Sequence, residues 1–335
     1  MIILDPGASI PAELRGASVA IGNFDGVHRG HQALLAEAQR AAAAAGRPWG
    51  VITFEPHPRS FFRPAEPVFR LSPAPLKARL LAALGADFML PLTFDAALAG
   101  LEAEAFVERV LGDQVGVGHL VTGFDFHFGK GRKGNADLLH ALGPRLGFTL
   151  AEIEQVTDPS GSAPFSSSAI RSALRHGSVI PAAHDLGYRW SVLGTVTTGD
   201  GRGRTIGFPT ANLVLQPGTD TRDGIYAVRV RDLGSSPPRP GMPGAAYIGS
   251  RPTFGSDRRF LEVHLLNFAS DLYGRELLVE FLAFIRPDRT FQDAASLTAQ
   301  ITLDCQACAR AIAEMDQNDP MRAFPLGRLQ ADGKI

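Results

Sequence analysis

The sequence predicts an α/β unit built on a parallel sheet, followed by a small antiparallel β-barrel or sandwich and a late helix. Two observations predict this order. In the first half, short apolar runs typical of strands alternate with helical stretches, which favours a parallel sheet covered by helices on both faces. From about Leu186, short strand-like runs follow one another with turn residues and no helical pattern between them, which is typical of an antiparallel barrel or sandwich.

Each element of the first half has its own signal. The run SVAIGNF is expected to be a buried strand, and the alanine-rich helix after it is expected to end at Gly46, a typical C-terminal cap. The stretch SSAIRSALRHG indicates a further helix before the pattern changes. The expected strands are 18–24, 49–54, 87–94 and 119–129, and the expected helices are 31–46, 75–85, 101–114 and 167–177.

The second half is expected to hold short strands and one closing helix. Apolar residues recur at steps of three and four from Leu297 to Ile312, which predicts a helix with one apolar stripe. Cys305 and Cys308 fall on that stripe, so core packing is favoured there over a redox or metal site. Residues from about 317 onwards are expected to be loose. The expected strands are 188–199, 224–233, 244–250, 258–266 and 276–285.

Composition limits the class of protein. At 335 residues the chain is long enough for two domains, which we expect to be 1–185 and 186–335. A net charge of -1 gives no global basic field for nucleic acid, so a phosphorylated ligand needs a local cluster of donors. No signal-peptide pattern and no apolar run of membrane-spanning length is present. Two cysteines cannot build a disulfide framework, which predicts a reduced, cytoplasmic protein.

The stretch NFDGVHRGH follows an expected strand and opens an expected helix. Ligands of open α/β sheets bind beyond the carboxyl ends of the strands, and a helix N-terminus favours an anion. Gly26 and Gly30 allow the backbone to approach a phosphate closely, and His28 and His31 can donate hydrogen bonds to its oxygens. The alternative is a polar loop with two surface histidines, and a zinc site lacks a third ligand at a convincing spacing.

A second glycine- and arginine-rich stretch, GDGRGRTIGFPTANL, lies at 199–213. Its glycines allow backbone N–H groups to curl around an anion, although no G-K-[ST] follows, so it is not a Walker P-loop. Thr210 and Asn212 offer neutral oxygens that suit Mg²⁺ beside nucleotide phosphates. In RFLEVHLL, strand periodicity places Glu262 and His264 on one face, where Glu262 has the chemistry of a general base. The alternatives are a glycine-rich hairpin and an ordinary solvent-facing glutamate.

These stretches resemble one known family in order. GNFDGVHRGH resembles the H-x-G-H signature of the nucleotidyltransferase superfamily, in the form typical of bacterial bifunctional riboflavin kinase/FAD synthetases. TFEPHP, GFDFHFGKGRKGN and FSSSAIR are similar to later segments of that family, with Ser168 where threonine is usual. GDGRGRTIGFPTANL, YIGSRPTFG and LEVHLLNFASDLYG resemble its riboflavin kinase module. The resemblance covers about residues 15 to 315.

The resemblance implies an α/β nucleotidyltransferase domain with a Rossmann-like parallel sheet, followed by a Greek-key antiparallel β-barrel with a C-terminal helix. It implies that the barrel phosphorylates riboflavin to FMN and that the first domain adenylylates FMN to FAD, both with ATP and Mg²⁺. The expected partners are therefore small molecules, with no nucleic acid and no membrane, and self-association is left open. Two other interpretations are an oligonucleotide-binding barrel, which the glutamate in LEVHLLNF disfavours, and a single active domain, which the intact motifs disfavour.

The resemblance also implies roles for individual residues. His28 and His31 steady the α- and β-phosphates of ATP, and Glu262 is the base for the riboflavin hydroxyl. Thr210 and Asn212 are ligands of Mg²⁺ beside ATP. Further ATP-binding residues are implied at Gly22, Phe24, Asp25, Gly26, Asp125, Gly129, Ser167, Ser168, Arg171, Gly201, Arg204 and Gly207. Flavin-binding residues are implied at Phe54, Pro56, Pro58, Phe62, Phe128 and Glu262.

Overall fold

A computed structural model describes residues 1–158, 160–161, 163–199, 202–235, 241–250 and 259–335. Within these ranges the chain forms two compact units, which are described separately. The first unit comprises residues 1–68 and 72–166, and the second comprises residues 69–71 and 167–335. None of the helices in the described ranges combines the length and the apolar composition that crossing a bilayer requires.

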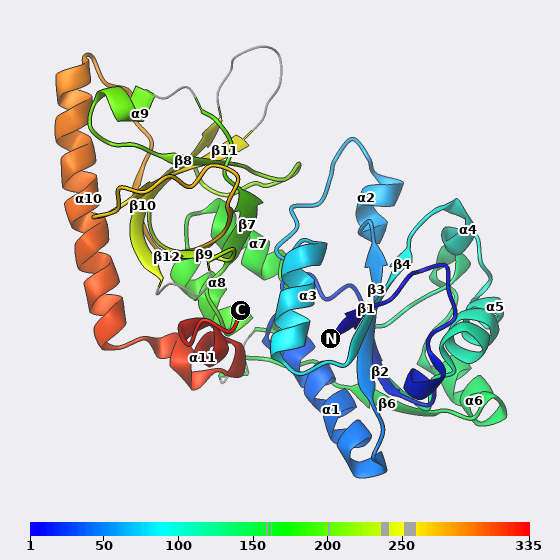
Figure 1. Ribbon diagram of the computed structural model, residues 1–335. Coiled ribbons are helices and arrows are strands. Elements are labelled where there is room, and N and C mark those ends of the chain that lie inside the picture. The colour runs from blue at the N-terminus through cyan, green and yellow to red at the C-terminus, as the bar shows by residue number, and fades with distance from the viewer. Residues whose placement is uncertain (159, 162, 200–201, 236–240, 251–258) are drawn as a thin grey trace. The chain divides into compact units, whose positions relative to one another are not determined.

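The first unit is built on a parallel sheet, to which the described residues contribute six strands in the order β1-β4-β3-β2-β5-β6. The interior strand β2 therefore lies between β3 and β5 (Figure 1). The four expected strands are present, which confirms the α/β class, and two strands, β1 and β6, were not expected. The strands are β1 Ile2–Ile3, β2 Ser18–Ile21, β3 Trp49–Glu55, β4 Phe88–Thr93, β5 His119–Gly123 and β6 Thr149–Ile153.

Helices cover both faces of this sheet (Figure 1). Helix α1 (Arg29–Ala45) ends at Gly46, which has a left-handed φ of 62°, as the sequence predicts. The expected helix 101–114 is present as α5 (Ala103–Ala105) and a π-helix, η2 (Phe106–Val115). The remaining helices of this unit are η1 Ala12–Leu14, α2 Pro58–Phe62, α3 Ala74–Ala83, α4 Ala96–Ala99, η3 Lys130–Arg132 and α6 Ala136–Leu146.

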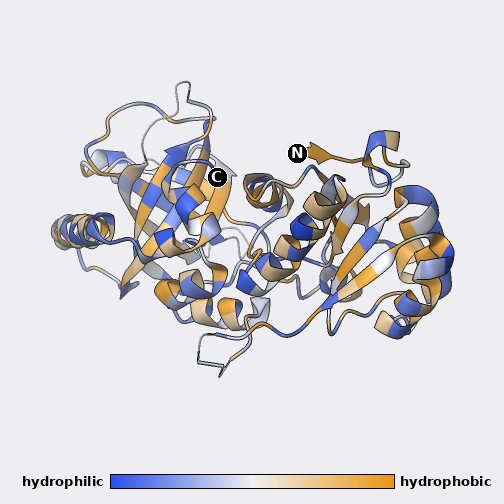
Figure 2. Cartoon of the chain, turned by 90° about the horizontal axis from the view of Figure 1, so that it is seen from below, coloured by the Kyte–Doolittle hydropathy of each residue, from blue (hydrophilic) through white to orange (hydrophobic). Residues whose placement is uncertain are grey.

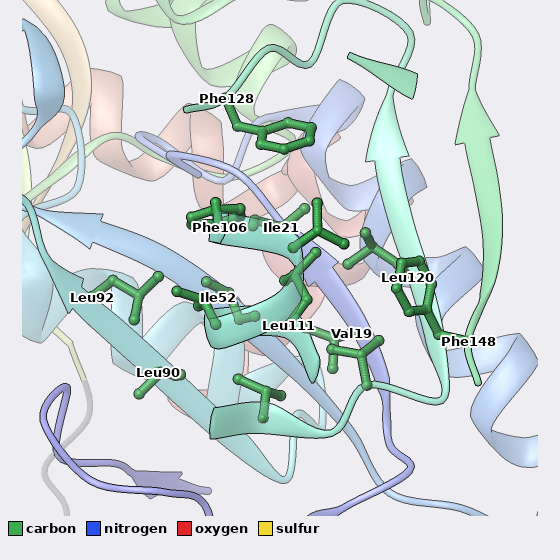
Figure 3. Packing of buried hydrophobic residues seen from close by; sticks show 14 of the residues in the cluster. Val19, Ile21, Ile52, Leu90, Leu92, Phe106, Leu111, Leu120, Phe128 and Phe148 are labelled. Carbon is green, nitrogen blue, oxygen red and sulfur yellow. The ribbon is translucent and has the colours of Figure 1, made fainter. Parts of the chain in front are cut away.

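The core of the first unit lies between the sheet and the π-helix η2 (Figure 3). Val19 and Ile21 of β2 and Ile52 of β3 are at most 1% exposed, and they belong to one cluster with Phe106 and Leu111 of η2. Continuous apolar runs are what parallel strands need when helices bury both faces of the sheet. This packing holds the ends of the strands in place, and the loops that follow them carry the candidate site.

Two expected strands end earlier than predicted. β2 stops at Ile21, because Phe24 has a φ of 46° and the chain leaves the extended conformation before it. β5 stops at Gly123, whose carbonyl oxygen accepts a hydrogen bond from the backbone N–H of Phe126 at 3.1 Å in a turn. Phe124 is 53% exposed as a result. In both places the apolar residues of a loop prolong a strand-like pattern.

The second unit begins with helices α7 (Ser167–Arg175) and α8 (Val179–Leu186), of which α8 was not expected. An antiparallel barrel follows, with the described strands in the order β7-β12-β9-β10-β11-β8. The backbone N–H of Thr197 donates to the carbonyl oxygen of Asn212 at 2.8 Å, so the barrel is nearly closed, and the prediction of a barrel is confirmed. The strands are β7 Ser191–Thr195, β8 Ala211–Val214, β9 Gly224–Asp232, β10 Met242–Ser250, β11 Arg259–Leu265 and β12 Glu276–Pro287.

Polar and apolar residues alternate along the barrel strands (Figure 2). Leu261 and Val263 of β11 are 0% and 1% exposed, and Glu262 between them lies on the other face, as predicted. The glycine-rich stretch departs from expectation, because it contains both strand β8 and a short helix, α9 (Arg202–Thr205). The expectation that no helix interrupts the strands is therefore wrong at α9.

The predicted late helix is confirmed as α10 (Ala294–Gln317). Cys308 and Ile312 of this helix are buried in one cluster with Ala227 of β9 and Leu282 of β12. The apolar stripe therefore packs against the barrel, and the cysteine on it is a core residue.

The expectation of a loose tail after residue 317 is wrong. The chain continues into a 3-10 turn, η4 (Pro320–Ala323), and helix α11 (Pro325–Ala331). Gln330 of α11 is 2% exposed. Its Oε1 accepts from the backbone N–H of Arg189 at 2.8 Å, and its Nε2 donates to the carbonyl oxygen of Arg189 at 3.0 Å. The tail is thus anchored to the segment that enters the barrel.

Candidate functional site

The strand order of the first sheet creates a topological switch point beside β2. From β2 the chain moves outward through β3 and β4, and it then crosses to β5 on the other side of β2. Loops that leave the carboxyl ends of β2 and β5 diverge at such a point, which is where open α/β sheets bind ligands. The loop after β2 contains His28, and the loop after β5 contains Asp125. Both were predicted as site residues from the sequence.

His28 and His31 come together at the start of α1. His28 is the N-cap residue, and its Nδ1 accepts a hydrogen bond from the backbone N–H of His31 at 3.3 Å. The two imidazole rings are stacked, with centroids 3.6 Å apart. His28 is 6% exposed, and the ring of Phe24 lies 5.2 Å from that of His31. Two imidazoles therefore meet at a helix N-terminus, whose N–H groups and dipole favour an anion.

The loop between β2 and α1 is held by Ser72. Asp25 Oδ1 accepts from the backbone N–H of Ser72 at 3.0 Å, and Ser72 Oγ accepts from the backbone N–H of Gly26 at 2.6 Å. Asp25 and Ser72 are both buried. Phe24 and Val27 have positive φ values of 46° and 41°, a strain that persists only where the surroundings impose it. Ser72 was not predicted, since nothing near it in sequence marks it.

The loop after β5 brings a further set of predicted residues to the carboxyl edge. Asp125 is exposed at its start. Phe128 is 6% exposed and packs against Phe106, with ring centroids 5.3 Å apart, so its contact with flavin stays a prediction. Gly129 has a φ of 70°, and a Cβ there would lie 2.7 Å from the Cα of Ala103. This close approach of two backbones explains why glycine is required.

An aromatic cluster follows β3 and β4 at the same edge. Phe94 packs against three rings at centroid distances of 6.0, 5.5 and 5.8 Å, namely those of Phe54, Phe61 and Phe62. Phe62 is 64% exposed, so the cluster presents apolar aromatic surface to solvent. Phe61 and Phe94 were not among the predicted flavin contacts. The segment from β3 into α2 supplies the two prolines that were, Pro56 and Pro58.

Ser167, Ser168 and Arg171 lie on α7, in the second compact unit. Nε of Arg171 donates to the carbonyl oxygen of Phe69 at 2.7 Å in the same unit, and Ser168 is exposed. Their grouping with the two histidines around one ATP molecule stays a prediction.

In the second unit, strand register brings Glu262 beside Asn212. Glu262 of β11 is paired directly with Asn212 of β8 on one side and with Tyr247 of β10 on the other. Directly paired residues of antiparallel strands lie on one face, with Cβ atoms about 4.5–5.5 Å apart. Tyr247 was not predicted, and its hydroxyl donates to Asp288 Oδ2 at 2.9 Å. Burial, followed by this hydrogen bond, raises the pKa of Tyr247.

The loop that precedes β8 is fixed by several contacts. Nδ2 of Asn212 donates to the carbonyl oxygen of Thr210 at 3.3 Å, and both residues are half-buried. Nδ1 of His264 lies 2.9 Å from the carbonyl oxygen of Pro209. A Cβ on Gly199 would lie 2.4 Å from Nδ2 of Asn212, so a larger residue there would displace the Asn212 side chain. The structure thus holds Thr210 and Asn212 in one place.

The predicted phosphate contacts in the glycine-rich stretch are less constrained. Arg204 is exposed, and Gly207 has a φ of 88° with nothing within 4 Å of a Cβ built on it. Gly201 lies outside the described residues. Contact of these residues with ATP stays a prediction.

A cavity of about 250 Å³ lies at the opposite, amino-terminal edge of the first sheet. Ser18 of β2, His119 of β5 and Thr149 of β6 line it, and none of the predicted site residues does. Burial lowers the pKa of His119.

In the described part of the chain, no group of three or more His, Cys, Asp or Glu side chains could hold a metal ion.

Comparison with known families matches both halves of the chain. Residues 10–169 match the model of the FAD synthetase family, and residues 186–312 match that of the riboflavin kinase family. With an α/β unit and an antiparallel barrel in that order, these matches define a transferase of flavin nucleotide synthesis.

Curated relatives specify the class further. The bifunctional riboflavin kinase/FMN adenylyltransferase of Escherichia coli (strain K12) is 40% identical over 293 residues, or 88% of this chain and 92% of the relative. That of Pseudomonas fluorescens is 42% identical over 302 residues, or 90% and 94%. A crystal structure described as a macrolide-efflux protein from Streptococcus pneumoniae has a TM-score of 0.78 and 29% identity, covering 95% of this chain and 99% of that one. The chain belongs to the bifunctional riboflavin kinase/FMN adenylyltransferase family and has both transferase activities.

Proposed function

We propose that adenylyl transfer takes place at the switch point of the first sheet, where His28 and His31 support the α- and β-phosphates of ATP. The stacked pair of imidazoles at the N-terminus of α1 carries this proposal. A phosphate oxygen of FMN attacks the α-phosphorus, the bond from that phosphorus to the bridging oxygen breaks, and pyrophosphate leaves. Such a step depends on positioning and on stabilisation of charge more than on covalent catalysis.

Further residues are part of the proposal. The aromatic cluster at the ends of β3 and β4 supports a flavin site, because the exposed ring of Phe62 offers a stacking surface. The ATP contacts are Gly22, Phe24, Asp25, Gly26, Asp125, Gly129, Ser167, Ser168 and Arg171. The flavin contacts are Phe54, Pro56, Pro58, Phe62 and Phe128.

Riboflavin phosphorylation is proposed for the face of the barrel where Glu262 pairs with Asn212. The carboxylate of Glu262 accepts the proton of the 5′-hydroxyl as its oxygen attacks the γ-phosphorus, the bond to the bridging oxygen breaks, and ADP leaves. Gly201, Arg204 and Gly207 contact ATP.

Mg²⁺ fits the donors present on this face. Thr210 and Asn212 offer hydroxyl and amide oxygens, which are hard ligands, and the hydrogen bond from Nδ2 of Asn212 to Thr210 directs the amide oxygen away from that carbonyl. Bound together with ATP, Mg²⁺ would neutralise negative charge on the phosphates. Thr210 and Asn212 would hold the ion, and Gly199 leaves room for the side chain of Asn212.

The two activities are proposed to divide between residues 1–185 and 186–335, since the family matches end at residue 169 and begin at residue 186. The cytoplasm is the proposed compartment, because ATP is available there and the two free thiols stay reduced there.

One incubation tests the proposed activities and the metal together. The full chain is mixed with riboflavin, ATP and Mg²⁺, and the flavins are separated by chromatography. We expect FMN and FAD to form, and both products to disappear when a chelator removes the metal. Absence of both products in the presence of Mg²⁺ would overturn the proposal.

A further inference from the structure

We propose that Lys77 is a positioning residue for adenylyl transfer, an inference that rests on the function proposed above for the first unit. Lys77 lies on α3, outside every motif by which the family was recognised. Its ammonium group joins the loop proposed to bind phosphate to the segment proposed to bind flavin, and so fixes the relation between the two substrates.

The contacts of Lys77 are those of a structural hub. Its side chain is 0% exposed, which is rare for lysine unless it is paired. Nζ donates three hydrogen bonds of 2.9 Å, to the carbonyl oxygen of Asn23, to Oγ1 of Thr53 and to Oε1 of Glu55. Oγ1 of Thr53 donates in turn to the same carbonyl oxygen of Asn23 at 3.1 Å. An ammonium offers three donors, and these three acceptors come from two separate segments of the chain.

Two of these acceptors lie in the segments that we propose to bind the two substrates. Asn23 directly precedes Phe24, where the backbone takes up its positive φ on the way to His28. Glu55 is the last residue of β3 and stands between Phe54 and Pro56, two of the proposed flavin contacts. One nitrogen atom therefore anchors a residue in each of the two proposed substrate segments.

This anchoring matters because the reaction is an in-line attack between two bound substrates. The FMN oxygen must be aligned with the α-phosphorus of ATP, and a misplacement of about 1 Å can lower the rate about 100-fold. Without Lys77, each substrate would still bind to its own segment. We therefore expect loss of Lys77 to lower kcat more than it lowers the affinity for either substrate.

The test compares two activities of one full-length chain carrying Lys77→Met, which keeps the length of the side chain and removes the three donors. We expect kcat for FAD formation from FMN to fall about 100-fold, with FMN binding per folded chain changed by less than about threefold. Riboflavin phosphorylation in the same preparation is the internal reference and is expected to be unchanged. Flavin fluorescence measures the binding, and circular dichroism measures the folded fraction.

Two further variants keep the proposal falsifiable if Lys77→Met does not fold. Thr53→Val removes one acceptor and leaves the charge pair intact, so kcat is expected to fall about 10-fold without loss of FMN binding. Gln114→Met is the matched control, because Nε2 of Gln114 also donates to two backbone carbonyls, those of Pro6 and Ala8, away from both substrate segments. Its kcat is expected to stay at the wild-type value.

Wild-type kcat in folded Lys77→Met and Thr53→Val would overturn the role assigned to Lys77. A loss of activity that merely parallels loss of folded, FMN-binding chain would also overturn it, since that is the behaviour of a purely structural lysine. Failure of the proposed function looks different. In that case the wild-type chain itself makes no FAD from FMN, or substitution of both His28 and His31 leaves FAD formation unaffected.

Discussion

Glu262 and Asn212 are direct partners across the antiparallel pair formed by β11 and β8, although they come from distant parts of the sequence. Tyr247 is the partner of Glu262 on its other side. The pairing places a carboxylate beside the amide that we propose as a ligand of Mg²⁺. A proton acceptor and a cation ligand on one sheet face are what transfer of a γ-phosphoryl group to a hydroxyl requires.

Glu262→Gln tests the proton acceptor. Glutamine keeps the size of the side chain but cannot accept the proton, so we expect kcat for FMN formation to fall by about 10²–10⁴-fold. Conversion of added FMN to FAD is expected to stay unchanged. Chromatography of the flavins measures both rates, and a parallel fall in both would count against the separation of the two sites.

His28 is the N-cap of α1 and is proposed to take part in adenylyl transfer, and two substitutions separate these roles. His28→Ala removes the N-cap and should lower the free energy of unfolding by about 0.5–2 kcal/mol, whereas His28→Asn keeps an N-cap acceptor and should retain stability. Both variants lose the imidazole, so we expect kcat for FAD formation to fall by about 10²–10³-fold in each. Urea unfolding and the FMN-to-FAD assay measure the two effects. Full activity in His28→Asn would show that the imidazole has no role in transfer.

The anchored tail makes a prediction about stability. The side-chain amide of Gln330 bonds the N–H and carbonyl of Arg189, and its Nε2 also donates to Ser191 Oγ at 3.1 Å. In Gln330→Ala the buried N–H of Arg189 loses its acceptor, while Ser191 Oγ still donates to the carbonyl oxygen of Arg189 at 2.8 Å. We therefore expect the free energy of unfolding to fall by about 1–3 kcal/mol. Gln306→Ala, at an exposed position of α10, is the control and should have little effect. Equal urea midpoints for the two variants would mean that the tail does not stabilise the barrel.

The cysteines make a prediction about pH. Burial raises the pKa of Cys305 to about 11 and that of Cys308 to about 12, from a value of 9.0 for an exposed thiol. The folded thiols therefore keep protons that unfolded thiols lose, so their contribution to stability is full below about pH 9 and is lost as the pH rises towards 12.

Because the thiolate is the reactive form, alkylation of the native chain by iodoacetamide is expected to keep accelerating beyond pH 9. Mass spectrometry of the labelled peptides gives the rate for each cysteine. In urea the rate should level off near pH 9. A native chain that levels off there as well would show that neither thiol is shielded.

Much of the fold could be predicted because its signals are local. Gly46 ends α1 as expected, and the alternation around Glu262 gives the correct face of β11.

The elements that were not predicted, such as β8 and α8, have physical reasons for escaping prediction. β8 has only four residues, and its partner β11 is distant in sequence, so no local pattern marks it. In α8, Pro181 stands in the first turn, where it removes no helical hydrogen bond, yet prolines usually suggest a break.

The motif residues of the candidate site were predicted from the sequence, but the residues that hold its loops in place were not. His28 lies between Gly26 and Gly30, and Asn212 ends a glycine-rich stretch, and such glycines indicate an unusual backbone conformation. Ser72 and Lys77 instead act on loops that are remote in sequence, through hydrogen bonds that only the folded chain creates. No pattern near either residue distinguishes it from an ordinary polar side chain.

We propose that two flavin oxygens attack ATP at two different sites, riboflavin at the γ-phosphorus and FMN at the α-phosphorus. The most direct measurement supplies riboflavin or FMN with ATP labelled by ³²P at either the α or the γ position, and follows the label into each flavin. We expect γ-label in FMN made from riboflavin, and α-label but no γ-label in FAD made from unlabelled FMN. With Glu262→Gln, the second result should persist and the first should vanish. Appearance of α-label in FMN made directly from riboflavin, or of γ-label in FAD made from unlabelled FMN, would contradict the proposal.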